Sequence, residues 1–397
     1  MLTAHRIALD PNDVQATYLS KACGVARFAY NWALDEWNKQ YEEHKKNPEK
    51  PAPTEGALRR LLNAIKREQF PWMLEVTKNA PQMAVMQLGK AFKNFFSGRA
   101  KYPKFRKKGI HDRFTLTNDQ FKVDGFHIQI PHLGKVRMRE ALKFTGKILS
   151  ATISRIADRW FVSIAIDTTD PVQKPTDQNI IGVDVGLTTM ATLSTGEKIT
   201  GPKPHKRLLS RLKQLSKAVS RKIKGSKNRA KAKIKLARLH ARISNIRLDA
   251  IHKFTTDLLR RFSVICIEDL NVRGMVRNRR LSRSISDMGF HEISRQLEYK
   301  SARNGQKLVT ADRFFPSSKT CSNCGFVLAE LELSVRQWTC PFCKRIHDRD
   351  VNAAKNLRMY AVSSTVQACG GSSSGQMDIP FGETAPMKQE INVNIYL

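Results

Sequence analysis

Hydrophobic positions follow a helical period over the first quarter of the chain. Leu19, Ala22 and Ala26 recur on one helical face, and a later segment opens with Asn79-Ala80-Pro81, which places Pro near a helix start. The aromatic residues of these segments are best explained as the buried side of the helices. We therefore predict a helical domain over residues 14–98.

The period changes to that of strands after residue 99. Runs that alternate apolar and polar residues, such as 127–131 and 160–166, are separated by Gly, Asp and Pro. Short strands with this spacing favour a small antiparallel barrel, which the N-terminal strand would complete. We predict this β-barrel over residues 1–13 and 99–172, with the helical domain inserted in it.

A third pattern begins at residue 179, after a polar linker. Two apolar strand-like runs carry an acid at or near their ends, Asp184 and Glu268, and residues 307–310 form a further run. A late helix opens at Asp350. Acids on a first strand, on a fourth strand and at a late helix are the arrangement of RNase H-like nucleases, so we predict an α/β domain of that class. It would cover residues 178–316 and 346–362.

The charge of the chain narrows the class of partner. The 397 residues include 69 Lys and Arg against 35 Asp and Glu, a net charge of +34. Such an excess favours a polyanion, whose phosphates release counterions when cations bind them. A membrane is the competing polyanionic surface, but no apolar run approaches the ~18 residues of a spanning helix, and the N-terminus lacks the apolar core of a signal peptide. We expect a cytosolic protein with no membrane partner.

Two segments concentrate the positive charge. Residues 203–247 carry 17 Lys and Arg and no acid, and their apolar stripes, interrupted at residues 224–226, predict a helical hairpin with a narrow seam. Residues 99–108 interleave Lys and Arg with aromatics. A charge run is usually a solvated face, but helices without compensating acid repel themselves unless a partner is bound. We predict phosphate contact by residues 203–247.

Four of the seven cysteines form two Cys-x-x-Cys pairs, Cys321 with Cys324 and Cys340 with Cys343, 15 residues apart. This spacing is typical of tetrahedral zinc, whereas paired disulfides are rare in the cytosol and a redox pair needs no second copy. Four protein ligands close the ion off, so we predict one structural Zn²⁺ in a zinc ribbon over residues 317–345. Gly325 follows the first pair, where a tight turn is expected.

The three acids predict a second metal site. Phosphodiester hydrolysis by two ions requires carboxylates that hold a pair of Mg²⁺ or Mn²⁺, and Asp184, Glu268 and Asp350 supply them. The competing reading is that Asp184 and Glu268 only terminate strands. Asp348 competes with Asp350 for the third position, but it could equally cap the helix, and we favour Asp350 because it precedes the helical face that packs inward.

Taken together, these residues resemble the TnpB family of RNA-guided nucleases encoded by insertion sequences, and the resemblance covers nearly the whole chain. It is carried by Gly182-Val183-Asp184-Val185-Gly186, Ile267-Glu268-Asp269-Leu270, Arg295-Gln296-Leu297-Glu298-Tyr299-Lys300, Phe315-Pro316-Ser317-Ser318-Lys319-Thr320-Cys321, His347-Asp348-Arg349-Asp350 and Asn352-Ala353-Ala354. In the N-terminal half, Ala26-Arg27-Phe28-Ala29-Tyr30-Asn31 and Tyr102-Pro103-Lys104-Phe105-Arg106-Lys107-Lys108 are similar too.

The resemblance implies that the acids are ligands of a RuvC-type nuclease, that the barrel is a wedge domain and that the inserted helices are a recognition domain. A guide RNA from the transposon end would pair with double-stranded target DNA, and the protein would read only a short adjacent motif. Lys78 and Gln82, one turn apart, are candidates for reading it. The expected phosphate contacts are Lys101, Tyr102, Lys104, Arg106, Lys107, Lys108, Arg211, Arg221, Lys222 and Lys224.

Two other functions compete with an RNA-guided endonuclease. A catalytically silent RNA-guided repressor would bind target without cutting, but such relatives lack the acids that this chain retains. A DDE-type transposase would use a similar acidic trio without bound RNA. Nothing in the sequence implies an oligomer, and the Ser- and Gly-rich residues 363–397 are expected to form a mobile tail.

Overall fold

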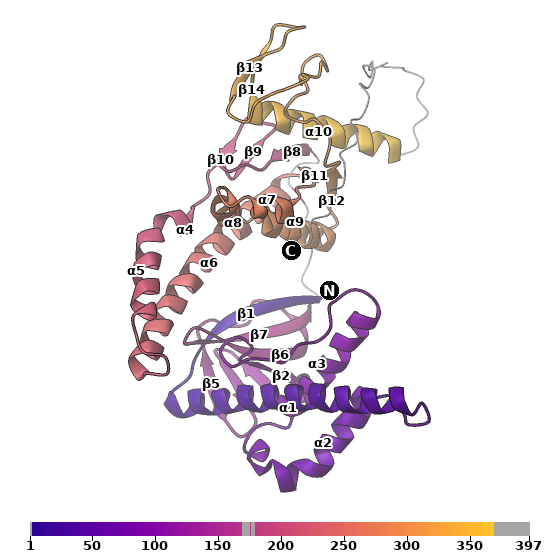
Figure 1. Ribbon diagram of the computed structural model, residues 1–397. Helices are drawn as coiled ribbons and strands as arrows, with labels where there is room; N and C mark the ends of the chain where they lie inside the picture. Colours follow the sequence, from indigo (N-terminus) through magenta and orange to yellow (C-terminus); the bar gives the residue numbers. More distant parts are fainter. Residues whose placement is uncertain (1, 169–174, 176–178, 369–397) are drawn as a thin grey trace. The chain divides into compact units, whose positions relative to one another are not determined.

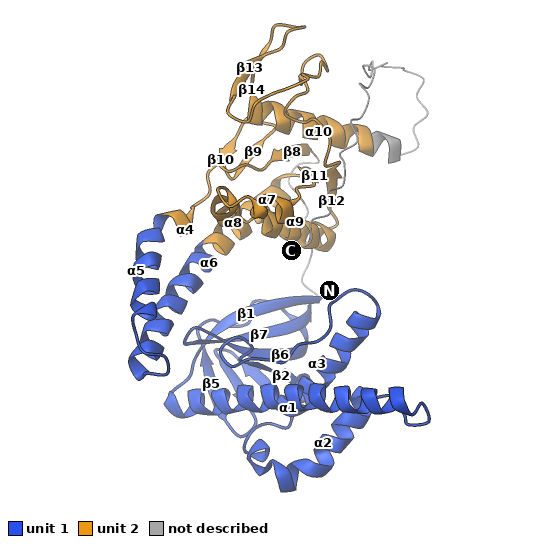
Figure 2. Ribbon diagram, viewed as in Figure 1, with its two compact units in different colours: residues 1–172, 207–246 blue, residues 173–206, 247–397 orange. Residues whose placement is uncertain are grey.

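The computed structural model describes residues 2–168, 175 and 179–368. Contacts group the chain into two compact units (Figure 2), one formed by Met1–Val172 and Arg207–Ile246, the other by Gln173–Lys206 and Arg247–Leu397. The predicted mobile tail lies mostly outside the described residues, although its first part, to residue 368, is helical. None of the described helices is both long and apolar enough to cross a bilayer.

The first unit combines long helices with an antiparallel sheet (Figure 1). The elements of this part of the chain are β1 (Leu2–Asp10), α1 (Asp13–Lys46), α2 (Glu55–Gln69), η1 (Pro71–Glu75), α3 (Asn79–Phe96), β2 (Arg113–Thr117), η2 (Asn118–Gln120), β3 (Lys122–Asp124), β4 (His127–Ile130), β5 (Gly134–Met138), β6 (Gly146–Ile156) and β7 (Arg159–Thr168). Helix α1 begins with a capping box, because the Asn12 side chain accepts from the Gln15 N–H and the Gln15 side chain accepts from the Asn12 N–H.

The seven strands form one sheet in the order β2-β6-β7-β1-β5-β4-β3. The N-terminal strand β1 is central, since it pairs along its length with β7 and at its end with β5. Strands β2 and β3 remain as edges, so the described pairings form an open sheet and closure into a barrel stays a prediction. One hydrophobic core joins the sheet to the helices, with Ile7, Leu34, Phe92 and Phe114 all buried in it.

A helical hairpin follows strand β10 (Lys198–Ile199). It consists of the short α4 (Pro204–Arg207), α5 (Leu209–Ser220) and α6 (Lys227–Arg261), and Gly225 has a φ of +89° in the turn between α5 and α6. Helix α6 is continuous for 35 residues and extends past the end of the basic run at residue 247. No Gly or Pro interrupts it, and its Ala, Leu, Lys and Arg residues are strong helix formers.

The second unit is built on a five-stranded mixed sheet in the order β10-β9-β8-β11-β12. Strands β8, β11 and β12 are parallel to one another, β9 pairs antiparallel with β8, and β10 pairs antiparallel with β9. The elements of this unit are β8 (Ile180–Asp184), β9 (Ala191–Leu193), β10 (Lys198–Ile199), β11 (Val264–Glu268), α7 (Val272–Arg277), α8 (Ser282–Met288), α9 (Phe290–Asn304), β12 (Lys307–Ala311), β13 (Gln337–Thr339), β14 (Ile346–Asp348) and α10 (Arg349–Ala368).

Helix α10 packs directly on β8 because Gly182 has no side chain. A Cβ at this position would lie 2.0 Å from the Ala354 carbonyl oxygen and 2.5 Å from the Arg358 nitrogen. The backbone of the helix therefore touches the backbone of the strand. This contact fixes the start of α10 relative to the end of β8.

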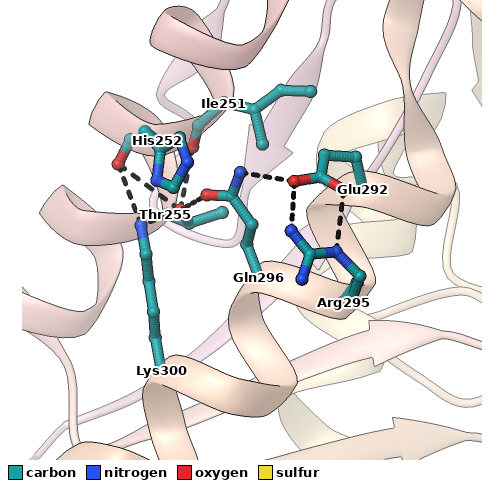
Figure 3. A network of polar contacts seen from close by, with 7 residues as sticks. All are labelled: Ile251, His252, Thr255, Glu292, Arg295, Gln296 and Lys300. Carbon is teal, nitrogen blue, oxygen red and sulfur yellow. Dashed lines mark hydrogen bonds and ion pairs between the residues drawn. The ribbon is translucent and has the colours of Figure 1, made fainter. Parts of the chain in front are cut away.

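A buried polar network joins α6 to α9 (Figure 3). The hydroxyl of Thr255 lies 2.9 Å from Gln296 Oε1, and Gln296 Nε2 donates to Glu292 at 2.8 Å. Lys300 Nζ donates to Thr255 Oγ1 at 2.7 Å and to Thr256 Oγ1 at 2.8 Å. Thr255 and Gln296 are fully buried, so these bonds satisfy groups that water does not reach.

Candidate functional site

The carboxyl ends of two neighbouring parallel strands bring Asp184 and Glu268 together. Strand β11 pairs with β8 so that Val264 faces Ile180 and Cys266 faces Gly182. Continued by two residues, the same register places Glu268 level with Asp184. Both residues end their strands, as the sequence predicted, and both lie at the same edge of the sheet.

Asp350 approaches the same edge from the first turn of α10. The three acids act on one another electrostatically: burial, then Glu268, then Asp350 raise the pKa of Asp184 to about 8. Arg349 and Arg336 lower it to a smaller extent. Asp184 therefore holds its proton at neutral pH, and a cation bound beside the three acids would favour its ionisation.

Asp348 has a different environment from Asp350. Its carboxylate accepts from the backbone N–H groups of Asp350 and Val351 at 3.1 and 3.0 Å, so it caps α10. It also forms an ion pair with Lys198 at 2.7 Å. Burial opposes ionisation, but Lys198 and these N–H groups hold the pKa of Asp348 below its ordinary value. Asp348 therefore binds Lys198 and the start of α10, whereas Asp350 acts electrostatically on Asp184.

The acids have polar neighbours that the sequence reasoning did not single out. The hydroxyl of the buried Ser317 donates to Glu268 Oε1, and Arg336 Nη1 forms an ion pair with Asp350 at 3.3 Å. Ser317 fixes one orientation of the Glu268 carboxylate. The only sequence signal for Ser317 was its place in the segment Phe315–Cys321, which is one of those that carry the resemblance to the family.

The four predicted cysteines form a compact cluster in the second unit. Their sulfur atoms all lie within 4.8 Å of one another, with Cys321 and Cys343 at 3.6 Å and Cys324 and Cys340 also at 3.6 Å. Tetrahedral zinc with Zn–S bonds of about 2.3 Å places its sulfur ligands about 3.8 Å apart, so the cluster fits the ion. Among the described residues this group alone brings three or more potential ligands close enough to share one ion.

A residue with a left-handed backbone conformation directly follows each cysteine pair. Gly325 has a φ of +79° after the first pair, and Lys344 has a φ of +61° after the second. This conformation folds both pairs back toward a common centre. The sequence signalled the first turn through its glycine, but nothing in it marked Lys344 for the second.

Hydrogen bonds tie the cysteine cluster to α10. Asn352 accepts from the Ser322 N–H at 2.9 Å and donates to the Thr320 carbonyl at 2.7 Å. Asn356 donates to the carbonyls of Ser317 and Thr320 at 2.6 and 2.7 Å. The first cysteine pair and the helix that carries Asp350 are thus one rigid assembly.

The predicted nucleic-acid contacts differ in accessibility. Arg106 and Gln82 are half-buried, whereas Tyr102 is exposed but binds Asn38 through its hydroxyl. The other predicted contacts have exposed side chains, and Arg211 donates to Gln214 at 2.6 Å. These exposed residues are Lys78, Lys101, Lys104, Lys107, Lys108, Arg211, Arg221, Lys222 and Lys224.

Three sequence-family models match the chain. Residues 163–279 match an IS605 OrfB family described as "Probable transposase", residues 290–357 match the "Cas12f1-like, TNB domain", and residues 1–46 match a helix-turn-helix domain of the same OrfB group. The matched segments include all three acids and all four clustered cysteines.

Relatives are similar over nearly their full length. A Streptomyces pristinaespiralis protein named "Putative RNA-guided DNA endonuclease" is 39% identical over 96% of this chain and 94% of its own. InsQ of Escherichia coli K12, with the same description, is 31% identical over 93% and 94%. A Cas12f1 chain, solved with guide RNA and target DNA, shares the fold with a TM-score of 0.56 and 16% identity, over 88% of this chain and 83% of that one.

Proposed function

Because the chain belongs to the IS605 OrfB (TnpB) family, we propose that it is an RNA-guided endonuclease that cuts double-stranded DNA by metal-dependent hydrolysis. The observation that carries this proposal is the convergence of Asp184, Glu268 and Asp350 at one sheet edge. The sheet order, with two antiparallel strands beside three parallel ones, supports assigning this unit to the RNase H-like, RuvC class.

The three acids would hold a pair of Mg²⁺ or Mn²⁺ ions. When bound, such ions supply an activated water and stabilise the leaving oxygen of a phosphodiester. Asp184 would lose its proton on loading, since two neighbouring acids and burial keep it protonated otherwise. Ser317 would orient Glu268, and the cap provided by Asp348 would fix the first turn of α10 and hence Asp350.

The cysteine cluster would hold one structural Zn²⁺. All four positions are protein sulfur, so no site is left for water or substrate. Through Asn352 and Asn356, the ion would stabilise the position of α10 and so act indirectly on the acid centre.

The nucleic-acid partners would be a guide RNA from the transposon end and the double-stranded DNA that it matches. Names and titles of relatives support this class of partner. In this proposal the seven-stranded sheet is the wedge domain and α1 to α3 are the recognition helices. Lys78 and Gln82 on α3 would read the adjacent motif, and the exposed Lys and Arg of the hairpin would contact phosphate.

A transposase is the second candidate, favoured by the description "Probable transposase" of the matched family. Bound RNA separates the two, since a transposase acts on transposon ends without a guide. A silent RNA-guided repressor is the third, and it would bind target without cutting. The three intact acids favour cleavage over this reading.

The first test is to purify the protein with its native flanking locus and sequence any RNA that co-purifies. The same preparation is then assayed with Mg²⁺ on a plasmid library that carries the matching target, using wild type and Asp184→Ala. Glu197→Gln is a matched control, because Glu197 pairs with Arg261 in the same unit, outside the acid trio. Discrete RNA with cutting that needs Asp184 supports the proposal. Bound RNA without cutting favours the repressor, and no RNA favours the transposase.

A further inference from the structure

One face of α1 holds the basic segment 102–112 at three points. Arg27, Asn31 and Asn38 are spaced by four and seven residues, so they lie along the same side of the helix. Asn38 accepts from the Tyr102 hydroxyl at 2.5 Å, and Arg27 forms an ion pair with Asp112 at 2.9 Å. Both side chains of this ion pair are mostly buried. The segment is thus fastened near both ends.

Between these two points, Asn31 binds the backbone of Arg106. Its Nδ2 donates to the Arg106 carbonyl at 3.0 Å, and its Oδ1 accepts from the Arg106 N–H at 2.7 Å. A side-chain amide that pairs with both backbone groups of one residue imitates a strand neighbour. It holds an irregular segment that has no strand partner of its own.

The Arg106 side chain is turned into the protein. Its guanidinium lies 3.7 Å from the centre of the Tyr30 ring and donates to Gln87 Oε1 at 2.8 Å. Gln87 is itself oriented by Thr115, to which its Nε2 donates at 3.1 Å. Burial lowers the pKa of Arg106 to about 10. These contacts use the planar face and one arm of the guanidinium.

The lysines of the segment point the other way. Lys101, Lys104, Lys107 and Lys108 are exposed, and none of them forms an ion pair within the described chain. The Phe105 ring is half exposed among them. A free loop with this many like charges would spread apart, and ordering it on a ligand would cost conformational entropy. Fastening it beforehand removes part of that cost.

We propose that the Arg27–Asn31–Asn38 face of α1 is a clamp, and that Tyr102 and Arg106 are positioning residues that present these four lysines as a pre-formed surface for a sugar–phosphate backbone. This revises the sequence interpretation, in which Tyr102 and Arg106 contact nucleic acid directly. The clamp stands on the contacts alone, whereas the nature of the ligand rests on the proposed function.

Limited trypsin digestion tests the clamp without any nucleic acid. Asn31→Ala removes no charge and creates no new cleavage site, yet it deletes both bonds to the Arg106 backbone. We expect early cleavage within residues 101–108 to accelerate about tenfold, because each lost hydrogen bond lowers the cost of local opening. Asn63→Ala, an exposed change on α2, is the control. Tyr102→Phe, which keeps the ring and loses one bond, gives a second reading if Asn31→Ala folds poorly. An unchanged cleavage rate in both variants overturns the clamp.

Salt dependence of binding tests the presentation of the lysines. The probe is a short RNA–DNA hybrid duplex of arbitrary sequence, bound at several salt concentrations. Each phosphate contact adds about 0.7–0.9 to the slope of log affinity against log salt. We expect Asn31→Ala to lower the slope almost as much as replacing all four lysines by Ala. Arg106→Lys should behave like Asn31→Ala, because an ammonium cannot stack on Tyr30 and reach Gln87 in the same geometry.

The possible results distinguish failure of the clamp from failure of the proposed RNA-guided endonuclease function. If Arg106→Lys binds as wild type while Arg106→Ala does not, Arg106 is a direct contact and the proposal fails. If the four-lysine variant keeps the wild-type slope, the lysines are not the surface and the proposal also fails. If the wild-type protein binds no nucleic acid but trypsin still distinguishes Asn31→Ala, the clamp stands and the proposed function falls.

Discussion

Asp348 caps the helix that carries Asp350, with the Asp350 N–H donating to the Asp348 carboxylate at 3.1 Å. Two acids of the same type, two residues apart, therefore have separable roles. Asp348 fixes the backbone at the start of α10, whereas Asp350 acts electrostatically on Asp184.

Asn substitutions should separate these two roles. Asp350→Asn should reduce DNA cleavage by at least about 100-fold, because it removes a charge from the proposed ion site. Asp348→Asn should keep most activity, since Asn is an equally good helix cap. Cleavage rates and melting temperatures of both variants are the measurements. Equal loss of cleavage in both, at unchanged melting temperature, would contradict the assignment.

Gly182→Ala should destabilise the second unit and abolish cleavage together. The new Cβ would lie 2.0 Å from the Ala354 carbonyl oxygen, so α10 would have to move away from β8. Overpacking of this kind costs about 1–3 kcal/mol or more of the free energy of unfolding. Gly56→Ala is the matched control: nothing lies within 4 Å of its added Cβ, and a helical Ala should stabilise α2 by up to about 1 kcal/mol. Urea unfolding of both variants checks the contrast.

Zinc should be present at one ion per chain and be lost on Cys340→Ser. Elemental analysis measures this directly, and Cys266→Ala is the control, since Cys266 is buried in β11, outside the cluster. Loss of zinc should also increase hydrogen exchange at the start of α10, through the bonds of Asn352 and Asn356. Full zinc content in Cys340→Ser would refute the four-sulfur site.

Lys300 should make stability depend on alkaline pH. Burial lowers its pKa from the ordinary 10.5 to about 8, with Glu292 opposing the change. The unfolded chain therefore binds more protons than the folded chain between about pH 8 and 10.5, and the contribution of Lys300 to stability rises over that window. We expect the melting temperature of wild type, relative to that of Lys300→Met, to increase as the pH rises above about 8. If the difference in melting temperature between the two proteins does not change with pH, Lys300 is charged in both the folded and the unfolded chain over this range.

Local patterns in the sequence indicated the cysteine cluster and many of the elements, whereas the direction of individual side chains depended on distant residues. The cysteine spacing is a local signal, and the structure gathers the four sulfur atoms, while the roles of the strand-end acids stay a prediction. The direction of Arg106 was not visible, because it depends on Tyr30, Asn31 and Gln87, which are far away along the chain.

The central place of β1 also constrains how the protein is made. Leu2–Asp10 is synthesised before its long partner, Arg159–Thr168, which follows only after some 150 further residues. Until then β1 has unpaired backbone groups on both sides and cannot complete the core that holds Ile7. A deletion within Leu2–Asp10 would therefore remove the middle of a sheet instead of a free edge.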